Sequence, residues 1–141
     1  MRYKFIDSTI LLSLDRDEYI NSSIESIFKD ERLKFGWING IGGVHNIEIG
    51  FYDLESKKYI RKKIKENYEL LSLTGNVTFS DSGYFVHTHA VLSNQRFESF
   101  GGHLFDAQIS LTGEFKIDIL DYRIDRKFSE EIGLNLWCIK R

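Results

Sequence analysis

Residues 68–92 have the sequence YELLSLTGNVTFSDSGYFVHTHAVL and predict a β-hairpin. Residues 68–79 and 84–92 are rich in β-branched and aromatic side chains, which favour strands. Asp81-Ser82-Gly83 lies between them and is a turn sequence. Because so short a connection cannot cross over to a parallel neighbour, we expect the two strands to pair antiparallel.

Short turn sequences separate further apolar runs on both sides of this hairpin. We expect strands at residues 37–41, 44–52, 58–65 and 105–120, with turns at 42–43, 53–56 and 93–95. Residues 3–14 are one bent strand or two short ones, and residues 134–139 are a candidate for one more. The pattern predicts an α+β fold with one curled, barrel-like and mostly antiparallel sheet.

One main helix is predicted before residue 37. Asp15 and Glu18 have the spacing of a capping box, although Ser or Thr is the preferred cap. Ile20, Ile24 and Ile27 follow at helical spacing. We therefore expect the helix to open at Asp15 and to end near residue 36.

Length and composition indicate one globular domain over residues 1–141. The chain has 42% hydrophobic residues and 20 aromatic ones (11 Phe, 7 Tyr and 2 Trp), enough apolar mass for a core. It has no proline, which excludes proline-rich linkers and proline-containing basic DNA hooks. Its net charge of -2 lacks the basic excess of proteins held to nucleic acid by bulk electrostatics, so such binding needs a local patch.

The cysteine content and the lack of a long apolar run indicate the compartment. The single Cys138 cannot form an intrachain disulfide and is interpreted as a small buried hydrophobe in a reducing environment. The apolar run at residues 10–12 is too short for a signal peptide or a membrane span. We expect a cytoplasmic protein with no membrane partner.

Three histidines are the candidate metal ligands. His87 and His89 point to the same side of a strand because they lie two residues apart. His103 follows Gly101-Gly102, and a hairpin through residues 94–95 would return it beside the pair. Three imidazoles with an open fourth position suit catalytic zinc, and imidazole also suits Fe, Ni and Cu. The alternative is that they form hydrogen bonds in a polar layer.

Glutamates are the candidates for a fourth ligand or for proton transfer. Glu69, Glu98 and Glu114 are the nearest acidic residues, and Glu69 or Glu114 is the candidate general acid/base. His45 is interpreted as a surface or hairpin residue outside the site.

For two further segments we prefer a structural role over phosphate binding. GIGG at residues 40–43 lacks the following helix that a phosphate loop needs, so we expect a tight connection between strands with positive φ. Six basic residues between 57 and 65 are expected to protect a sheet edge from stray pairing, the alternative being phosphate contact.

Five motifs in order carry a family resemblance over nearly the whole chain. They are WINGIG (37–42), YELLSLTGN (68–76), HTH (87–89), GGHL (101–104) and Glu114. Together they resemble the PPC domain, the plants-and-prokaryotes conserved domain. The resemblance implies a curled antiparallel sheet beside a helix and a homotrimer, in which strands and loops of one subunit pack on the next.

The resemblance also implies possible partners and a cofactor. In plants the domain follows an AT-hook in nuclear DNA-binding proteins, and stand-alone prokaryotic members have DNA-binding names by that association. With no proline, this chain has no Arg-Gly-Arg-Pro hook. The fold is similar to that of acetolactate decarboxylase and a zinc-dependent ester hydrolase, whose zinc ligands match His87, His89 and His103.

Two functional hypotheses follow. The first is a trimeric PPC protein that acts as an oligomeric binding or regulatory module, with DNA or a protein as partner and residues 57–65 as the phosphate-facing surface. The second is a small zinc-dependent hydrolase or lyase with Glu69 or Glu114 moving protons. A cupin is a distant third, because the glutamate expected shortly after a cupin His-X-His pair is replaced by VLSN at residues 91–94.

Overall fold

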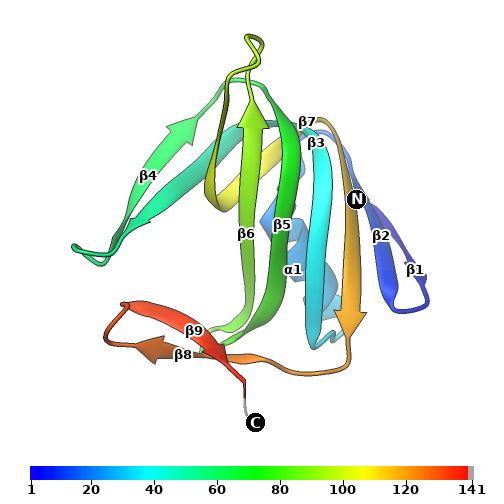
Figure 1. Ribbon diagram of the computed structural model, residues 1–141. Helices are drawn as coiled ribbons and strands as arrows, with labels where there is room; N and C mark the ends of the chain where they lie inside the picture. Colours follow the sequence, from blue (N-terminus) through cyan, green and yellow to red (C-terminus); the bar gives the residue numbers. More distant parts are fainter. Residues whose placement is uncertain (140–141) are drawn as a thin grey trace.

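The computed structural model describes residues 1–139 as one curved sheet with a single helix against it (Figure 1). In chain order the elements are β1 (Arg2–Ile6), β2 (Thr9–Leu14), α1 (Ile20–Asp30), β3 (Phe35–Asp53), β4 (Lys58–Ile64), β5 (Tyr68–Ser80), β6 (Gly83–Ser93), β7 (Ser99–Leu120), β8 (Asp125–Ser129) and β9 (Leu134–Cys138).

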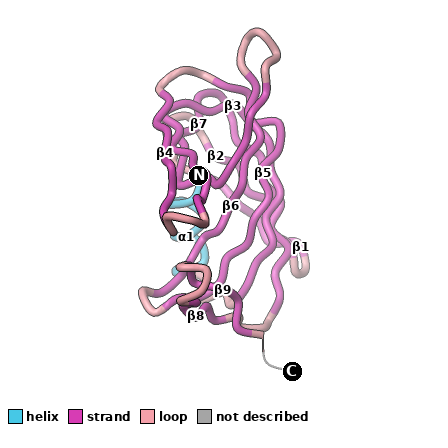
Figure 2. The backbone as a smooth tube through the Cα atoms, turned by 60° about the vertical axis from the view of Figure 1, so that its left-hand side comes forward, coloured by secondary structure: helices cyan, strands magenta, loops and turns pink. Residues whose placement is uncertain are grey.

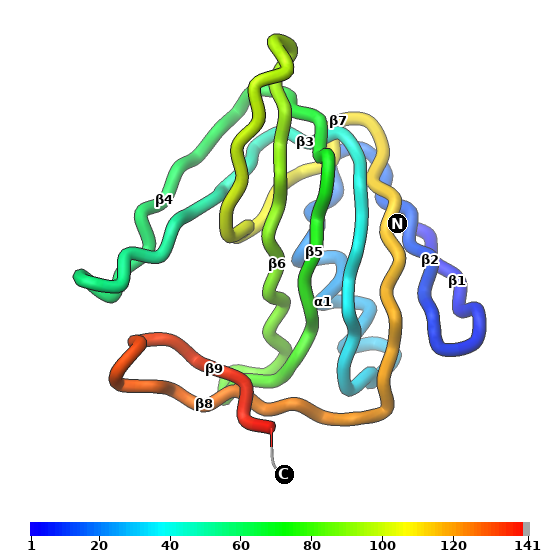
Figure 3. The backbone as a smooth tube through the Cα atoms, in the orientation of Figure 1, coloured from blue at the N-terminus to red at the C-terminus, as the bar shows by residue number. Residues whose placement is uncertain are grey.

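The sheet is mixed but mostly antiparallel, as the sequence predicts. Its main path is β1-β2-β7-β3-β5-β8-β9, with β4 on β3 and with β6 pairing to both β5 and β7. Only the single bridge between β5 and β8 is parallel among the described strands. Strands β3, β5, β6 and β7 each pair with the next and make a partial ring, while β4 and the β1–β2 and β8–β9 hairpins extend from it (Figure 3).

Strand β3 runs without interruption, so the turn predicted at residues 42–43 is wrong. The pairing register shifts between Gly40 and Gly42, and the strand continues through the irregularity. A Cβ at Gly40 would overlap the Phe115 ring, and one at Gly42 would overlap the Thr112 carbonyl oxygen. Positive φ is confined to Gly83 and Gly133 among the described glycines. The glycines in β3 therefore permit close packing of β7 and do not reverse the chain.

Helix α1 begins later than the sequence predicts. The backbone N–H of Asp15 does donate to the Glu18 carboxylate at 2.7 Å, but this contact closes a turn before the helix. The Ile109 N–H donates to the Glu18 carbonyl at 2.9 Å, which ties residues 15–18 to β7 and delays the helix to Ile20. No described helix has the length and apolar character needed to cross a membrane.

The core lies between α1 and the concave side of the sheet. The helix contributes Ile24, Ile27 and Phe28, all with no exposed surface. A carboxylate from β7 takes the place of a local cap, because Asp106 accepts the backbone N–H groups of Asn21 at 2.9 Å and of Ser22 at 3.2 Å. The helix is thus fastened to β7 at its N-terminus.

The β8–β9 hairpin lies at the C-terminal end of the described residues. The predicted strand at residues 134–139 is present as β9, and β8 before it was not predicted. Asp125 bridges to Phe79, whose N–H donates to the Ile124 carbonyl at 3.0 Å. Figure 2 shows the β8–β9 hairpin at the lower end of β6, beside the start of that strand.

Candidate metal site

Strands β6 and β7 bring the three predicted histidines together. His89 lies directly opposite His103 in the antiparallel register, and His87 is two residues away on the same face of β6. One ligand nitrogen from each ring lies within 4.8 Å of the others. The expected return of the chain through residues 94–95 is therefore confirmed.

The residues between the histidines fix the direction of the imidazoles. Thr88 has no exposed surface, and its hydroxyl donates to the Asn21 Oδ1 on α1 at 2.8 Å. The Asn21 amide in turn donates to the Leu104 carbonyl at 3.1 Å. Because side chains alternate along a strand, a Thr88 that faces the helix places both neighbouring imidazoles on the other face.

The spacing of one nitrogen pair fits a tetrahedral ion, and all three ligand nitrogens lie within 4.8 Å of one another. The Nε2 atoms of His87 and His89 are 3.2 Å apart, close to the roughly 3.4 Å edge of a tetrahedron with metal–nitrogen bonds of about 2.05 Å. The Nδ1 atom of His103 is buried and has no hydrogen-bond partner in the described part of the chain. Three imidazoles and a buried nitrogen without a partner fit a borderline metal such as zinc.

The electrostatics keep these imidazoles neutral at physiological pH. Burial, followed by the nearby Arg126 guanidinium, lowers the pKa of His87 to about 4. Burial, followed by the neighbouring His89, lowers the pKa of His103 to about 4. Burial also lowers the pKa of His89. A neutral imidazole offers the lone pair that a metal ion needs.

Arg126 on β8 is a site residue that the sequence did not indicate. Its guanidinium group donates to the Thr78 hydroxyl at 2.8 Å and to the Asn135 carbonyl at 2.9 Å. Another nitrogen of the same group lies 3.2 Å from the Asn76 Oδ1 and 3.3 Å from the His87 Nδ1. The β8–β9 hairpin, of which the sequence predicted only the second strand, thus places a buried cation beside the histidines.

A pocket of about 460 Å³ opens beside this cluster. His87, His103 and Arg126 line it together with aromatic side chains and Arg61 from β4. The Arg61 guanidinium lies 3.6 Å from the centre of the Phe105 ring. The pocket volume is in the range of small-molecule sites.

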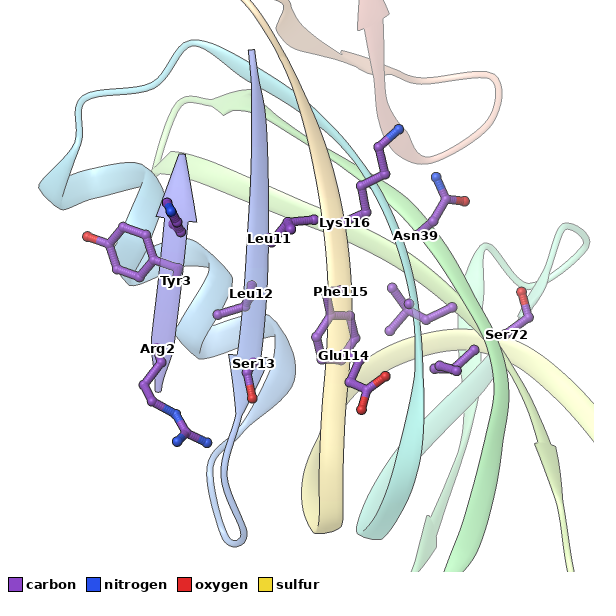
Figure 4. A pocket seen from close by; sticks show the side chains of 14 residues that line it. Arg2, Tyr3, Leu11, Leu12, Ser13, Asn39, Ser72, Glu114, Phe115 and Lys116 are labelled. Atoms are coloured by element: carbon purple, nitrogen blue, oxygen red, sulfur yellow. The ribbon is translucent and has the colours of Figure 1, made fainter. Parts of the chain in front are cut away.

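The predicted glutamates lie elsewhere. Glu69 pairs with Ser93 and lines a separate pocket. It is five residues along β5 from Thr74, the residue opposite His89, which is about 17 Å at a rise of about 3.4 Å per residue. Glu114 is 11 residues beyond His103, about 36 Å along β7, and lines the pocket in Figure 4. Glu98 lies in the β6–β7 turn and accepts hydrogen bonds from Asn94 and Arg96.

Apart from Arg61, which lines the pocket, the other predicted features lie at the surface or away from the site. His45 is outside the cluster, 3.4 Å from the Asp17 carboxylate. Strand β4 is an edge strand that pairs with β3 alone, as predicted for the basic segment. Its Arg61 and Lys63 both approach Glu48, at 3.1 and 3.9 Å.

Known proteins resemble this chain in sequence and in structure. The model of the Plants and Prokaryotes Conserved (PCC) domain, abbreviated PPC above, matches residues 1–121. A "putative dna binding protein" from Bacteroides thetaiotaomicron is 27% identical, with 99% of this chain and 98% of that chain covered and a TM-score of 0.94. A metal-containing protein from Archaeoglobus fulgidus is 34% identical, with 99% of both chains covered and a TM-score of 0.86.

A more distant likeness concerns the fold alone. Acetolactate decarboxylase from Bacillus subtilis is 18% identical, with 82% of this chain and 54% of that chain covered and a TM-score of 0.51. The similarity of fold expected from the sequence is therefore present. No curated relative matches the sequence.

Proposed function

Because this chain belongs to the Plants and Prokaryotes Conserved domain family, we propose that it is a homotrimeric binding module with one zinc ion at His87, His89 and His103 in each subunit. The observation that carries this proposal is the convergence of three ligand nitrogens within 4.8 Å. The three imidazoles would fill three positions of a tetrahedral ion and leave the fourth open for a ligand. The metal-containing family member that is 34% identical supports a metal at this fold.

Metal content tests the proposal directly. We expect about one equivalent of zinc per chain by elemental analysis after expression in zinc-supplemented medium, and a lower melting temperature after chelation, because a bound ion stabilises the native state. The variant His103→Asn should lose most of the zinc. His45→Asn is the matched control, since it removes an imidazole outside the cluster. Less than one-tenth of an equivalent in the parent protein contradicts the proposal.

The regulatory form of this proposal has duplex DNA or a protein as partner, in a cytoplasmic setting. Its support is the edge strand β4, where Lys58, Lys62 and Lys63 are exposed, and the DNA-binding name of the Bacteroides protein. Contact with phosphates through this strand predicts an affinity that falls steeply with salt. An absence of duplex binding at low salt, or binding that does not change with salt, removes DNA as the partner.

The pocket beside the histidines favours a second candidate, a small zinc-dependent hydrolase or lyase. Bound zinc would acidify a water or polarise a carbonyl group of the substrate. Arg126 and Arg61 would orient a substrate within the 460 Å³ pocket, which aromatic side chains also line. Glu69 and Glu114 line other pockets of the subunit, so the residues at hand for positioning are the two arginines. Hydrolysis of p-nitrophenyl acetate that depends on His87 tests this candidate.

A further inference from the structure

The pocket beside the three histidines has an unbalanced positive charge. Arg126 is only 8% exposed and forms no ion pair with any carboxylate in residues 1–139. Arg61 adds a second guanidinium, which also pairs with Glu48 at 3.1 Å, and no aspartate or glutamate is among the described lining residues. A buried cation without a counter-charge is costly unless a ligand compensates it.

The hydrogen bonds of Arg126 leave one of its donors without a partner among the described groups. A guanidinium group has five N–H donors and no acceptor. Four of its contacts are with Thr78, Asn135, Asn76 and the Nδ1 of His87. The fifth donor has no partner among the described groups.

Metal coordination would free one more donor. Because a guanidinium only donates, its contact with the His87 Nδ1 requires a lone pair on that nitrogen and leaves the proton on Nε2. A metal at Nε2 would need the lone pair of Nε2, and the proton of the neutral ring would then lie on Nδ1. Nδ1 could then no longer accept from Arg126, and a second N–H of the guanidinium would be available to another acceptor.

We infer that the natural ligand of this pocket is a small oxyanion, a carboxylate or a phosphate, bound by Arg126 and Arg61 with one oxygen directed at the metal. This inference rests on the proposed three-histidine metal site. Two adjacent N–H donors on a planar guanidinium match the paired oxygens of such a group.

The pocket walls define the rest of the ligand. The Arg126 guanidinium lies 4.6 Å from the centre of the Phe85 ring, and the Tyr59 ring centre lies 4.8 Å from that of His103. Phe105 and Phe128 also line the pocket. The ligand therefore has an oxyanion head and a compact apolar or planar body.

Calorimetric titration of the zinc-loaded protein tests this assignment. The probes are benzoate and inorganic phosphate, with benzamide as a neutral analogue of benzoate. We expect at least one of the two anions to bind at least tenfold more tightly than benzamide, and the preferred anion distinguishes a carboxylate from a phosphate ligand. The variant Arg126→Gln should lose at least tenfold in anion affinity while it keeps its zinc.

Two variants on β4 provide the internal comparison. Arg61→Gln should weaken anion binding severalfold, whereas Lys63→Gln should leave it within twofold. Both residues lie on one face of β4 and approach Glu48, but only Arg61 lines the pocket. Should Arg126→Gln fail to fold, the pair on β4 decides the question.

The outcomes separate this inference from the proposed function. Equal affinity for benzoate and benzamide with no phosphate binding, or unchanged anion affinity in the arginine variants, overturns the oxyanion assignment even when zinc is bound. A protein that takes up no zinc but binds the anion through Arg126 retains the oxyanion ligand of the arginines, and it overturns both the metal function and the metal-directed oxygen. Absence of anion binding in both the zinc-loaded and the metal-free protein overturns the assignment.

Discussion

Thr88 is the residue that orients the candidate site. Its hydroxyl is the side-chain polar group between the two imidazoles on β6, and it is fully buried against Asn21 of α1. The contact commits Thr88 to the helix side and therefore commits His87 and His89 to the pocket side. The Thr88–Asn21 hydrogen bond on the helix face of the sheet thus helps to place the histidine cluster on the opposite face.

Replacement of Thr88 by valine keeps the shape and removes this hydrogen bond. We expect a loss of about 1–3 kcal/mol in the free energy of unfolding, because the Asn21 Oδ1 loses its donor in a buried environment. Urea denaturation measures the loss. Thr74→Val is the control, since Thr74 is exposed and lies opposite His89 on β5, and its effect should stay within about 0.5 kcal/mol. Equal stabilities of the two variants would contradict this role for Thr88.

Asp118 provides a pH-dependent link between β2 and β7. The Lys116 ammonium group, followed by the Thr9 hydroxyl, lowers the pKa of the Asp118 carboxyl below its ordinary value of 3.8. Since the folded state favours the charged form, the stabilisation is complete above pH 3.8 and is lost as the pH falls through the lowered pKa.

The variant Asp118→Asn should therefore flatten the acid limb of the stability curve. We expect its melting temperature to fall less than that of the parent as the pH falls from about 4 to about 2. Thermal melts at half-unit pH intervals measure the slopes. Asp81→Asn, an exposed change in the β5–β6 turn, is the control; identical slopes for Asp118→Asn and the parent refute the link.

Among single residues, the sequence identified the histidines and missed Arg126. The spacing of His87 and His89 specifies a shared face whatever the partner strand, and a short turn is enough to return His103. Arg126 reaches the site from a five-residue strand that joins the rest of the sheet through one bridge, between Phe79 and Asp125. No local pattern encodes such a contact, because it depends on where the whole hairpin docks.

At the scale of elements, glycine has the same structural role in the β5–β6 pair, which the sequence predicted correctly, and in β3, where a turn was wrongly predicted. The paired strands β5 and β6 were predicted from their patterns, whereas the glycines of β3 were taken for a turn. In both places glycine admits a neighbouring backbone at close range. A Cβ at Gly75 would overlap the His87 carbonyl oxygen, a backbone atom of β6. The same residue type that ends a strand in one context permits tight pairing in another.

Gly75→Ala should consequently damage the fold and the candidate site together. We expect a destabilisation of roughly 1–3 kcal/mol from overpacking and a weaker zinc affinity, because β6 must shift at His87 to admit the methyl group. Chemical denaturation and a competitive zinc titration measure the two effects. Ser72→Ala, an exposed change on the same strand, should alter neither. An unchanged zinc affinity in Gly75→Ala separates the site from the β5–β6 contact.

The helix shows how tertiary contacts override a local signal. Asp15 and Glu18 have the spacing of a helix start and do form the expected hydrogen bond. The carbonyl of Glu18 nevertheless accepts from Ile109 on β7, so this segment belongs to the sheet edge and α1 starts at Ile20. The capping function passes to Asp106, which is far away in sequence and therefore invisible to a local pattern.

At the scale of the whole molecule, four apolar side chains lie exposed on neighbouring strands. Ile41 on β3, Leu71 on β5, Val91 on β6 and Leu111 on β7 are 43–71% exposed, and we call them the outer patch. Leu111 lies beside Gly43, two residues from Ile41. Apolar groups that continue across several strands mark an interaction surface. The patch is our candidate for the subunit contact of the proposed trimer.

A charge placed in the outer patch tests that assembly. We expect the parent protein to have a mass three times that of the 16.5 kDa chain by light scattering coupled to size exclusion. Ile41→Glu should shift it toward the single-chain mass, because an unpaired carboxylate is costly to bury at an interface. Leu54→Glu is the matched control, an equally exposed apolar residue on the β3–β4 turn, and should remain trimeric. A monomeric parent contradicts the trimer itself, whereas an Ile41→Glu variant that stays trimeric moves the interface to another face.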